Sequence, residues 1–258
     1  MKRINCNMLK AILFDLDNTL ILFNESDFYD GYFERIAETF SDVMPAARFQ
    51  ETLKNATISL LRNQGEVSNA RFFMNAFAAG IPDRSEELWQ LFLHFYKTEF
   101  DNLERNISLP ESLHELFDYL IKTNIKLVLA SNPIFPMDAQ LRRLAWAGLE
   151  HIPFYYVTHI ENMSFCKPRV EYYKQICQKI DESPESCLMV GNDPVNDMVA
   201  ARAGLSTYLT TDVRDDDSTS LTVSRELRVG WTSDIPEPDF KGPLAGLKNV
   251  VEQLGYKK

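Results

Sequence analysis

Two carboxylates stand directly after an apolar run near the start of the chain. In "KAILFDLDNTLI", Asp15 and Asp17 follow the residues "AILF", and Thr19 comes two positions further on. Two carboxylates at the end of a buried strand cost free energy unless a cation offsets their charge. Mg²⁺ is such a cation, because proteins usually hold it with one or two carboxylates, waters and a substrate phosphate. The pair therefore predicts a divalent metal site at this point of the chain.

Polar residues also follow two further apolar runs, and one lysine precedes a proline. In an open parallel sheet, ligands bind at the carboxyl ends of the strands, so these positions are informative. Each alone has a structural explanation, since Ser-Asn-Pro and Gly-Asn-Asp form good turns and helix caps. Behind "IKLVLA", behind "CLMV" and before Pro168, the residues are Ser131, Asn132, Asn192, Asp193, Asp197 and Lys167.

These positions complete the donor set that the first two carboxylates require. Asp15, Asp193 and a backbone carbonyl near Asp17 are candidate ligands of Mg²⁺, which prefers oxygen donors. Lys167 would place a second positive charge beside the same anions. The sequence thus favours a site that binds a small anion together with a metal.

The elements that position these residues are short apolar runs separated by helical stretches. The runs are "AILF", "IKLVLA", "FYYVT", "CLMV" and "STYLT". Continuous apolar runs of this length are typical of strands buried on both faces of a parallel sheet. Because helical stretches alternate with the runs, we expect an α/β fold with a doubly wound parallel sheet.

The interval 22–106 differs from the rest of the chain, because it contains no convincing strand. Phe28, Tyr32, Ile36 and Phe40 recur at helical spacing, and aromatic-rich helical stretches follow them. We expect an inserted α-helical cap over 22–106, whose aromatic stripes form its own core rather than a cofactor site. Residues 1–21 and 107–258 would form the α/β core. In the core's tail, an acidic stretch within 212–240 is expected to be a solvated loop, and "GPLAGLKNVVEQLG" a closing helix.

Composition limits the class of partner. The chain has 258 residues, 45% hydrophobic and 25% charged, with a net charge of −10. This charge argues against binding to nucleic acid, which needs clustered cations. No apolar run is long enough for a membrane span. Four cysteines without metal-ligand spacing are typical of reduced thiols, so we expect a cytoplasmic protein.

The combined motifs resemble the haloacid dehalogenase superfamily. The resemblance is carried by "DLDNT" at 15–19, by Ser131-Asn132 after a strand, by Lys167-Pro168 and by "VGNDPVND" around Asp193. The motifs occur in the family's order, and the helical insert matches members whose cap lies between the first two motifs. The resemblance implies a Rossmann-like core and a Mg²⁺-dependent phosphatase acting on a small phosphorylated metabolite.

The resemblance also implies roles for individual residues. Asp15 would be the nucleophile that forms an aspartyl-phosphate, and Asp17 the acid and then the base. Ser131 and Lys167 would stabilise the transferring phosphoryl group, and Thr19 and Asn132 would bind the substrate. The residues expected around Mg²⁺ are Asp15, Asp17, Asn192, Asp193 and Asp197.

One position departs from the family pattern. Members commonly read Gly-Asp, whereas Gly191 is followed by Asn192 and the acid comes one place later, at Asp193. Because a carboxylate offers Mg²⁺ a full charge, we expect Asp193 to be the second anionic ligand. The alternative is that Asp193 only caps a helix while Asn192 occupies the ligand position.

Other reactions are compatible with the same core. A dehalogenase would need the nucleophile but no second acid, so Asp17 weighs against it. A phosphonate-cleaving enzyme would want a Schiff-base lysine in the cap, where only Lys54 and Lys97 are available. A phosphomutase would use the same aspartyl-phosphate, and a non-catalytic binding module would not need the full set. Neither the substrate nor the oligomeric state follows from these motifs.

Overall fold

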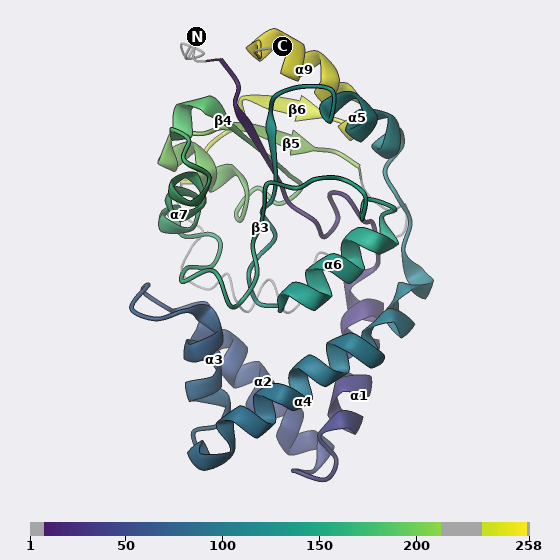
Figure 1. The fold of residues 1–258 in the computed structure, drawn as a ribbon, viewed down its shortest axis with the longest axis vertical. Helices are drawn as coiled ribbons and strands as arrows, with labels where there is room; N and C mark the ends of the chain where they lie inside the picture. Colours follow the sequence, from purple (N-terminus) through teal and green to yellow (C-terminus); the bar gives the residue numbers. More distant parts are fainter. Residues whose placement is uncertain (1–7, 213–233, 257–258) are drawn as a thin grey trace.

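A six-stranded parallel sheet forms the centre of the protein (Figure 1). The computed structural model describes residues 8–212 and 234–256, with only the backbone of 104–106. Within these residues the strand order is β3-β2-β1-β4-β5-β6, and every neighbouring pair is parallel. The strands are β1 (Ala11–Phe14), β2 (Lys126–Leu129), β3 (Tyr156–Val157), β4 (Cys187–Gly191), β5 (Ser206–Thr210) and β6 (Phe240–Gly242).

The apolar character of the central strand follows from burial on both faces. Successive side chains of a strand point to opposite faces. In β1, Ile12 and Phe14 join one hydrophobic cluster, while Ala11 and Leu13 join another, and all four are fully buried. Helices therefore cover both faces of the sheet, which confirms the predicted doubly wound α/β architecture.

Three helices and one 3₁₀ segment supply this cover. On the face of Ile12 and Phe14 lie α5 (Leu113–Leu120) and α9 (Leu247–Leu254), which contact each other. On the other face lie α7 (Val170–Ile180) and the 3₁₀ segment η4 (Met198–Ala203). The remaining short 3₁₀ segments are η1 (Pro82–Arg84), η2 (Phe100–Asn106), η3 (Pro184–Ser186) and η5 (Leu244–Gly246).

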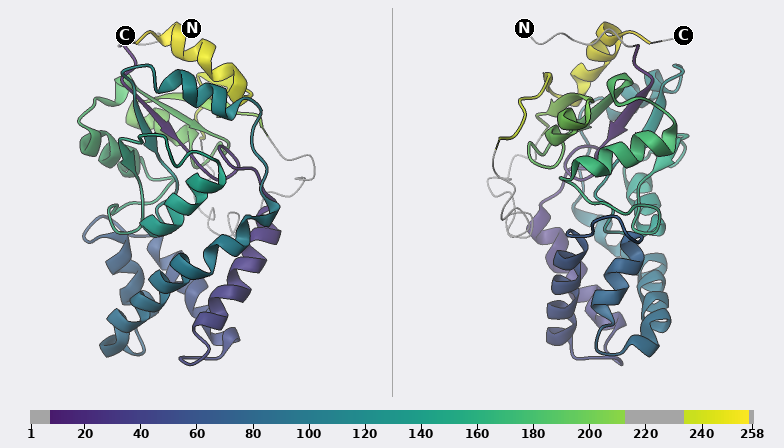
Figure 2. Two further views of the ribbon diagram at one scale, coloured as in Figure 1. Left: turned by 45° about the vertical axis from the view of Figure 1, so that its right-hand side comes forward. Right: turned by 90° about the vertical axis from the view of Figure 1, so that its left-hand side faces the viewer.

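Four helices lie together beyond the carboxyl ends of the strands (Figures 1 and 2). They are α1 (Glu25–Thr39), α2 (Ala46–Leu60), α3 (Asn69–Phe77) and α4 (Ser85–Thr98). Apart from the isolated bridge of Leu22 with Ser108, no residue described between 22 and 106 pairs as a strand. The rings of Phe40, Phe49 and Phe92 pack with centroid distances of 4.6 to 6.4 Å, so aromatic side chains fill the interior of the bundle.

The helical bundle is fixed to the sheet domain at two places. On one side, α4 and η2 pack against α6 (Met137–Trp146), and Arg142 of α6 pairs with Asp101 of η2 at 2.9 Å. On the other side, the fully buried Asn69 donates its side-chain amide to the carbonyls of Pro133 and Phe165, each at 3.4 Å. The bundle therefore covers the edge of the sheet at which the candidate residues stand.

Several details differ from the sequence-based expectation. The run "FYYVT" contributes only the two residues of β3, and the stretch "DMVAARAG" after β4 forms a 3₁₀ segment. The helix after Lys167 begins at Val170, two residues beyond Pro168. Strand β6 was not expected, and 213–233, most of the acidic stretch, lies outside the described residues.

Two further expectations concern membranes and cysteines. None of the helices in 8–212 and 234–256 combines the length and apolar character needed to cross a bilayer. The cysteines described there, Cys166, Cys177 and Cys187, are buried free thiols.

Candidate active site

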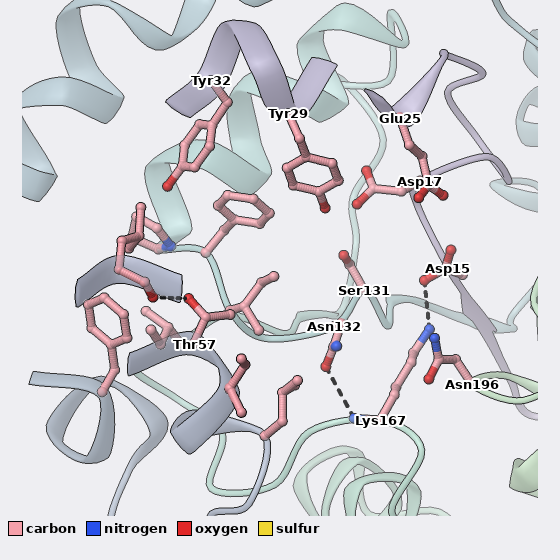
Figure 3. Close-up of a pocket in the computed structure, with 18 of the residues that line it drawn as sticks. Asp15, Asp17, Glu25, Tyr29, Tyr32, Thr57, Ser131, Asn132, Lys167 and Asn196 are labelled. Carbon is pink, nitrogen blue, oxygen red and sulfur yellow. Dashed lines mark hydrogen bonds and ion pairs between the residues drawn. The ribbon is translucent and has the colours of Figure 1, made fainter. Parts of the chain in front are cut away.

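The ammonium group of Lys167 lies between two buried carboxylates. Its Nζ is 2.6 Å from Oδ1 of Asp15 (Figure 3) and 2.6 Å from Oδ1 of Asp197. Asp15 follows β1 directly, and its N–H donates to the carbonyl of Val190 in the neighbouring β4. Because three distant segments supply these groups, the parallel pairing of the sheet is what brings them together.

Burial and charge set the protonation of this group. Burial raises the pKa of Asp15 to about 7; Lys167 lowers it, while the charges of Asp197 and Asp17 add to the rise. Burial lowers the pKa of Lys167, but Asp15 and Asp197 overcome this and hold it well above its usual range. Lys167 is therefore a fixed cation. A further cation near Asp15 would favour the ionised form of Asp15.

Asp17 has a different cationic partner. The guanidinium of Arg143 in α6 donates from one nitrogen to both carboxylate oxygens, at 2.7 and 2.8 Å. A second nitrogen of Arg143 donates to Gln140 at 2.5 Å, and the guanidinium lies 4.6 Å from the ring centroid of Phe135. Although Asp15 and Asp17 are two residues apart, each is held by its own cation.

Arg143 was not among the residues predicted from the sequence. Its side chain is fully buried, which is rare for a charged residue unless it is paired. A signal was present in "MDAQLRRLAW", because Gln140 and Arg143 share the helical face of the buried Ala139 and Leu144. Polar side chains on the inner face of a short helix indicate a partner in the interior.

The residues after β2 support the loop beside Asp15. Ser131 is buried, and its carbonyl accepts hydrogen bonds from the hydroxyls of Thr158 and Tyr172, at 2.7 and 2.8 Å. The side chain of Asn132 accepts from the N–H of Lys167 at 3.1 Å. Asn132 therefore holds the loop that carries Lys167. This positioning role was not predicted from the sequence, which indicated only a contact with substrate.

Asn192 lies near Asp15 through a shared hydroxyl. The Oγ1 of Thr19 is 3.4 Å from Oδ2 of Asp15 and 3.3 Å from Oδ1 of Asn192, and can donate to either. Thr19 itself is fully buried. Oδ1 of Asn192 thus shares the Thr19 hydroxyl with Oδ2 of Asp15, the carboxylate oxygen that Lys167 does not contact.

Asp193 instead holds the turn that follows β4. Its Oδ1 accepts from the N–H groups of Val195 and Asn196, at 2.8 and 3.1 Å, and its Oδ2 from the side chain of Asn196. These contacts correspond to the capping alternative, and they favour Asn192 over Asp193 for direct contact beside Asp15.

Gly191 allows Asp197 to approach the end of β4. A Cβ atom at Gly191 would lie 2.1 Å from Oδ2 of Asp197, which is far inside van der Waals contact. The same oxygen accepts from the N–H of Asp193 at 3.0 Å. Asp197 therefore joins the turn to Lys167 and is positioned by backbone as well as by charge.

The sequence-predicted residues border one cavity with a volume of about 370 Å³. Thr19 is not among the lining residues and reaches the site through its hydroxyl. The predicted residues that line the cavity are Asp15, Asp17, Ser131, Asn132, Lys167, Asn192, Asp193 and Asp197.

The donors around Asp15 fit a hard divalent cation. Among the described residues, no three His, Cys, Asp or Glu side chains lie together as a metal-binding group. Lys167 pairs with Asp15 and Asp197, and Arg143 pairs with Asp17. Mg²⁺ needs only one or two carboxylates when substrate phosphate and water complete its coordination. Oδ2 of Asp15, which Lys167 does not contact, and the amide oxygen of Asn192 are donors of the required type.

Comparison with known proteins identifies the family. The sequence model of haloacid dehalogenase-like hydrolases matches residues 9–204. The chain therefore belongs to this family, and it is a hydrolase with a Rossmann-like core. No protein in a search of curated sequences matches it.

Solved structures show the same fold at low sequence identity. A 2-haloacid dehalogenase from Pseudomonas syringae has a TM-score of 0.56 at 17% identity, covering 95% of this chain and 99% of that one. The magnesium-bound hydrolase YfnB from Bacillus subtilis has a TM-score of 0.52 at 20% identity, covering 95% and 100%. A protein from Haemophilus somnus, assigned by prediction as a phosphoglycolate phosphatase, has a TM-score of 0.53 at 16% identity, covering 95% and 98%. These likenesses establish the fold and leave the reaction open.

Proposed function

We propose that this protein is a Mg²⁺-dependent phosphatase that hydrolyses a small phosphate monoester through an aspartyl-phosphate on Asp15. The observation that carries the proposal is the separation of two neighbouring carboxylates by their partners, Asp15 on Lys167 and Asp17 on Arg143. A nucleophile alone would suffice for displacing a halide. A second carboxylate with its own orientation is what protonation of an alcohol leaving group requires.

In the first step, a carboxylate oxygen of Asp15 attacks phosphorus. Lys167, 2.6 Å from Oδ1, holds this carboxylate in place. The bond between phosphorus and the leaving oxygen breaks, and Asp17 donates a proton to that oxygen. The products are the free alcohol, a phosphorylated Asp15 and an ionised Asp17.

In the second step, Asp17 takes a proton from a water molecule that attacks phosphorus. The bond between phosphorus and Asp15 breaks, which regenerates the carboxylate and releases inorganic phosphate. Arg143 donates to both oxygens of Asp17 and so holds this side chain in one orientation for both steps.

The charge on the phosphoryl oxygens requires cations throughout. Lys167 lies at the nucleophile, and Ser131 lines the same end of the cavity. When bound, Mg²⁺ would be held by Asp15 and Asn192 and would supply further positive charge against the phosphoryl oxygens.

The helices α1 to α4, within 22–106, are proposed to act as the cap. They contribute the cavity wall opposite the sheet, so they would exclude water from the reaction and would have to move to admit substrate. Interdomain movement is described for the magnesium-bound YfnB protein.

The free thiols in the described core support a reducing compartment, in line with the expected cytoplasmic location.

Product analysis tests the reaction class. The purified protein is incubated with an aryl phosphate, with and without Mg²⁺, and inorganic phosphate is measured. Mg²⁺-dependent phosphate release is expected, and chloride release from 2-chloropropionate is not. Chloride release without phosphate release would make the protein a dehalogenase, and transfer to a second position of a sugar phosphate would make it a mutase.

A further inference from the structure

The cavity at Asp15 has two chemically different ends. Asp15, Lys167 and Ser131 line one end, at the edge of the sheet. The other end extends between α1, α2 and α4, where Tyr29, Tyr32 and Thr57 face the cavity opposite these residues (Figure 3). A phosphate monoester held with its phosphorus at Asp15 would therefore place its alcohol part among the helices.

The wall of the helical end is mainly apolar. The lining side chains that keep partial exposure, and so can touch a ligand, include Tyr29, Phe33, Ile58, Leu61, Trp89 and Ile134. Apolar and aromatic side chains gain most from contact with apolar ligand surface that leaves water. Apart from the hydroxyl of Tyr29 and the indole N–H of Trp89, these side chains offer no hydrogen-bonding group to the hydroxyls of a sugar.

Several polar groups of this wall have partners within the protein. The hydroxyls of Tyr32 and Tyr96 form a hydrogen bond of 2.7 Å with each other, and Thr57 donates to the carbonyl of Leu53 at 2.9 Å. Glu25 accepts from the side chain of Asn18 at 3.2 Å. A ligand hydroxyl that finds no partner at this end loses the hydrogen bonds it made to water.

From these contacts we propose that the substrate is a phosphate monoester of an apolar alcohol, whose hydrocarbon or aromatic part packs against α1, α2 and α4. The proposal rests on the phosphatase function proposed above and specifies its substrate class. It excludes sugar phosphates and other polyhydroxylated esters as preferred substrates.

The test compares two esters with similar leaving groups, so that intrinsic reactivity does not decide the result. 2-Phenylethyl phosphate and glycerol 3-phosphate are both esters of primary alcohols. We expect kcat/KM to be about 100-fold higher for 2-phenylethyl phosphate, as burial of a phenyl-sized apolar surface would give. Equal values, or a preference for glycerol 3-phosphate, would overturn the substrate class while leaving the phosphatase intact.

Variants of the wall separate this effect from general reactivity. Phe33→Gln places a polar group in the helical end and should reduce the preference for the phenyl ester at least tenfold. Leu141→Gln on α6 is the control, since Leu141 is 48% exposed and lies outside the cavity. A preference that survives in Phe33→Gln as in Leu141→Gln would contradict the proposal. If neither ester releases phosphate while an aryl phosphate does, this substrate class is wrong and the phosphatase function stands.

Discussion

The guanidinium of Arg143 donates to both carboxylate oxygens of Asp17, at 2.7 and 2.8 Å. Arg143 is fully buried in α6, whereas the side chain of Asp17 keeps 27% exposure toward the cavity. One face of the acid is thus fixed by the protein, and the other remains open to a substrate or a water molecule. The pair joins the first loop of the chain to a helix 126 positions later.

Replacing Arg143 should impair chemistry more than binding. In Arg143→Met, Asp17 loses both hydrogen bonds but remains present, so we expect kcat to fall about 10- to 100-fold, part of the 10²–10⁴-fold that acid–base catalysis supplies. KM should change little, and Arg143→Lys should recover part of kcat. Steady-state kinetics with an aryl phosphate measure both quantities.

The neighbouring Arg142 is the control for this substitution. Its side chain is 46% exposed and pairs with Asp101 away from the cavity. If a folded Arg143→Met protein keeps as much kcat as Arg142→Met, Arg143 does not position the acid.

Asn192 and Asp193 should respond differently to Mg²⁺. Asn192→Ala removes an oxygen donor beside Asp15, so the Mg²⁺ concentration for half-maximal activity should rise at least tenfold. Asp193→Ala removes the cap of the turn and should lower the free energy of unfolding by about 0.5–2 kcal/mol with a smaller change in Mg²⁺ requirement. Mg²⁺ titrations of activity and of thermal unfolding give two readouts. The opposite ranking would restore Asp193 as the ligand.

The contrast between these residues shows what the sequence could and could not predict. The fold class followed from apolar runs that alternate with helical stretches, and the runs are recognisable because β1 and β4 are buried on both faces. The acids and Lys167 were found because they stand next to strand ends or a proline. Arg143 was missed because the local pattern in α6 indicates a buried polar side chain but not its partner, which lies 126 positions away. The direction of the Asp193 side chain depends on the turn geometry after β4, which spacing alone does not specify.

The buried ion pair of Asp197 should contribute to stability. In Asp197→Ala, Lys167 would keep only Asp15 as a partner, and the N–H of Asp193 would lose its acceptor. Breaking one side of a buried pair costs about 3–5 kcal/mol. Asp138→Ala, which removes an exposed pair with Lys97, should cost less than about 1 kcal/mol. Urea unfolding measures the free energy of unfolding of both variants. Similar losses would show that the buried ion pair stabilises the fold no more than the exposed pair does.

The contact between the bundle and the sheet domain depends on Gly65. Its φ is +93°, and a Cβ atom there would lie 2.2 Å from the ring of Phe165. Gly65→Ala should therefore separate this loop from the core and increase hydrogen exchange in residues 63–70 and 163–166. Gly80→Ala is the matched control, because a Cβ at Gly80 meets nothing within 4 Å. Unchanged exchange in Gly65→Ala would show that this contact does not hold the bundle in place.

The most direct test of the mechanism is detection of phosphate bound to Asp15. In Asp17→Asn, an activated aryl phosphate needs little acid assistance, so the first step should proceed while hydrolysis of the intermediate becomes slow. Acid quenching in the presence of Mg²⁺, followed by mass spectrometry of the peptides, should find one added phosphoryl group on the peptide that contains Asp15. The group should be absent when Asp15 is also replaced by Asn. A burst of aryl alcohol without protein-bound phosphate, or a phosphoryl group on another residue, would contradict this mechanism.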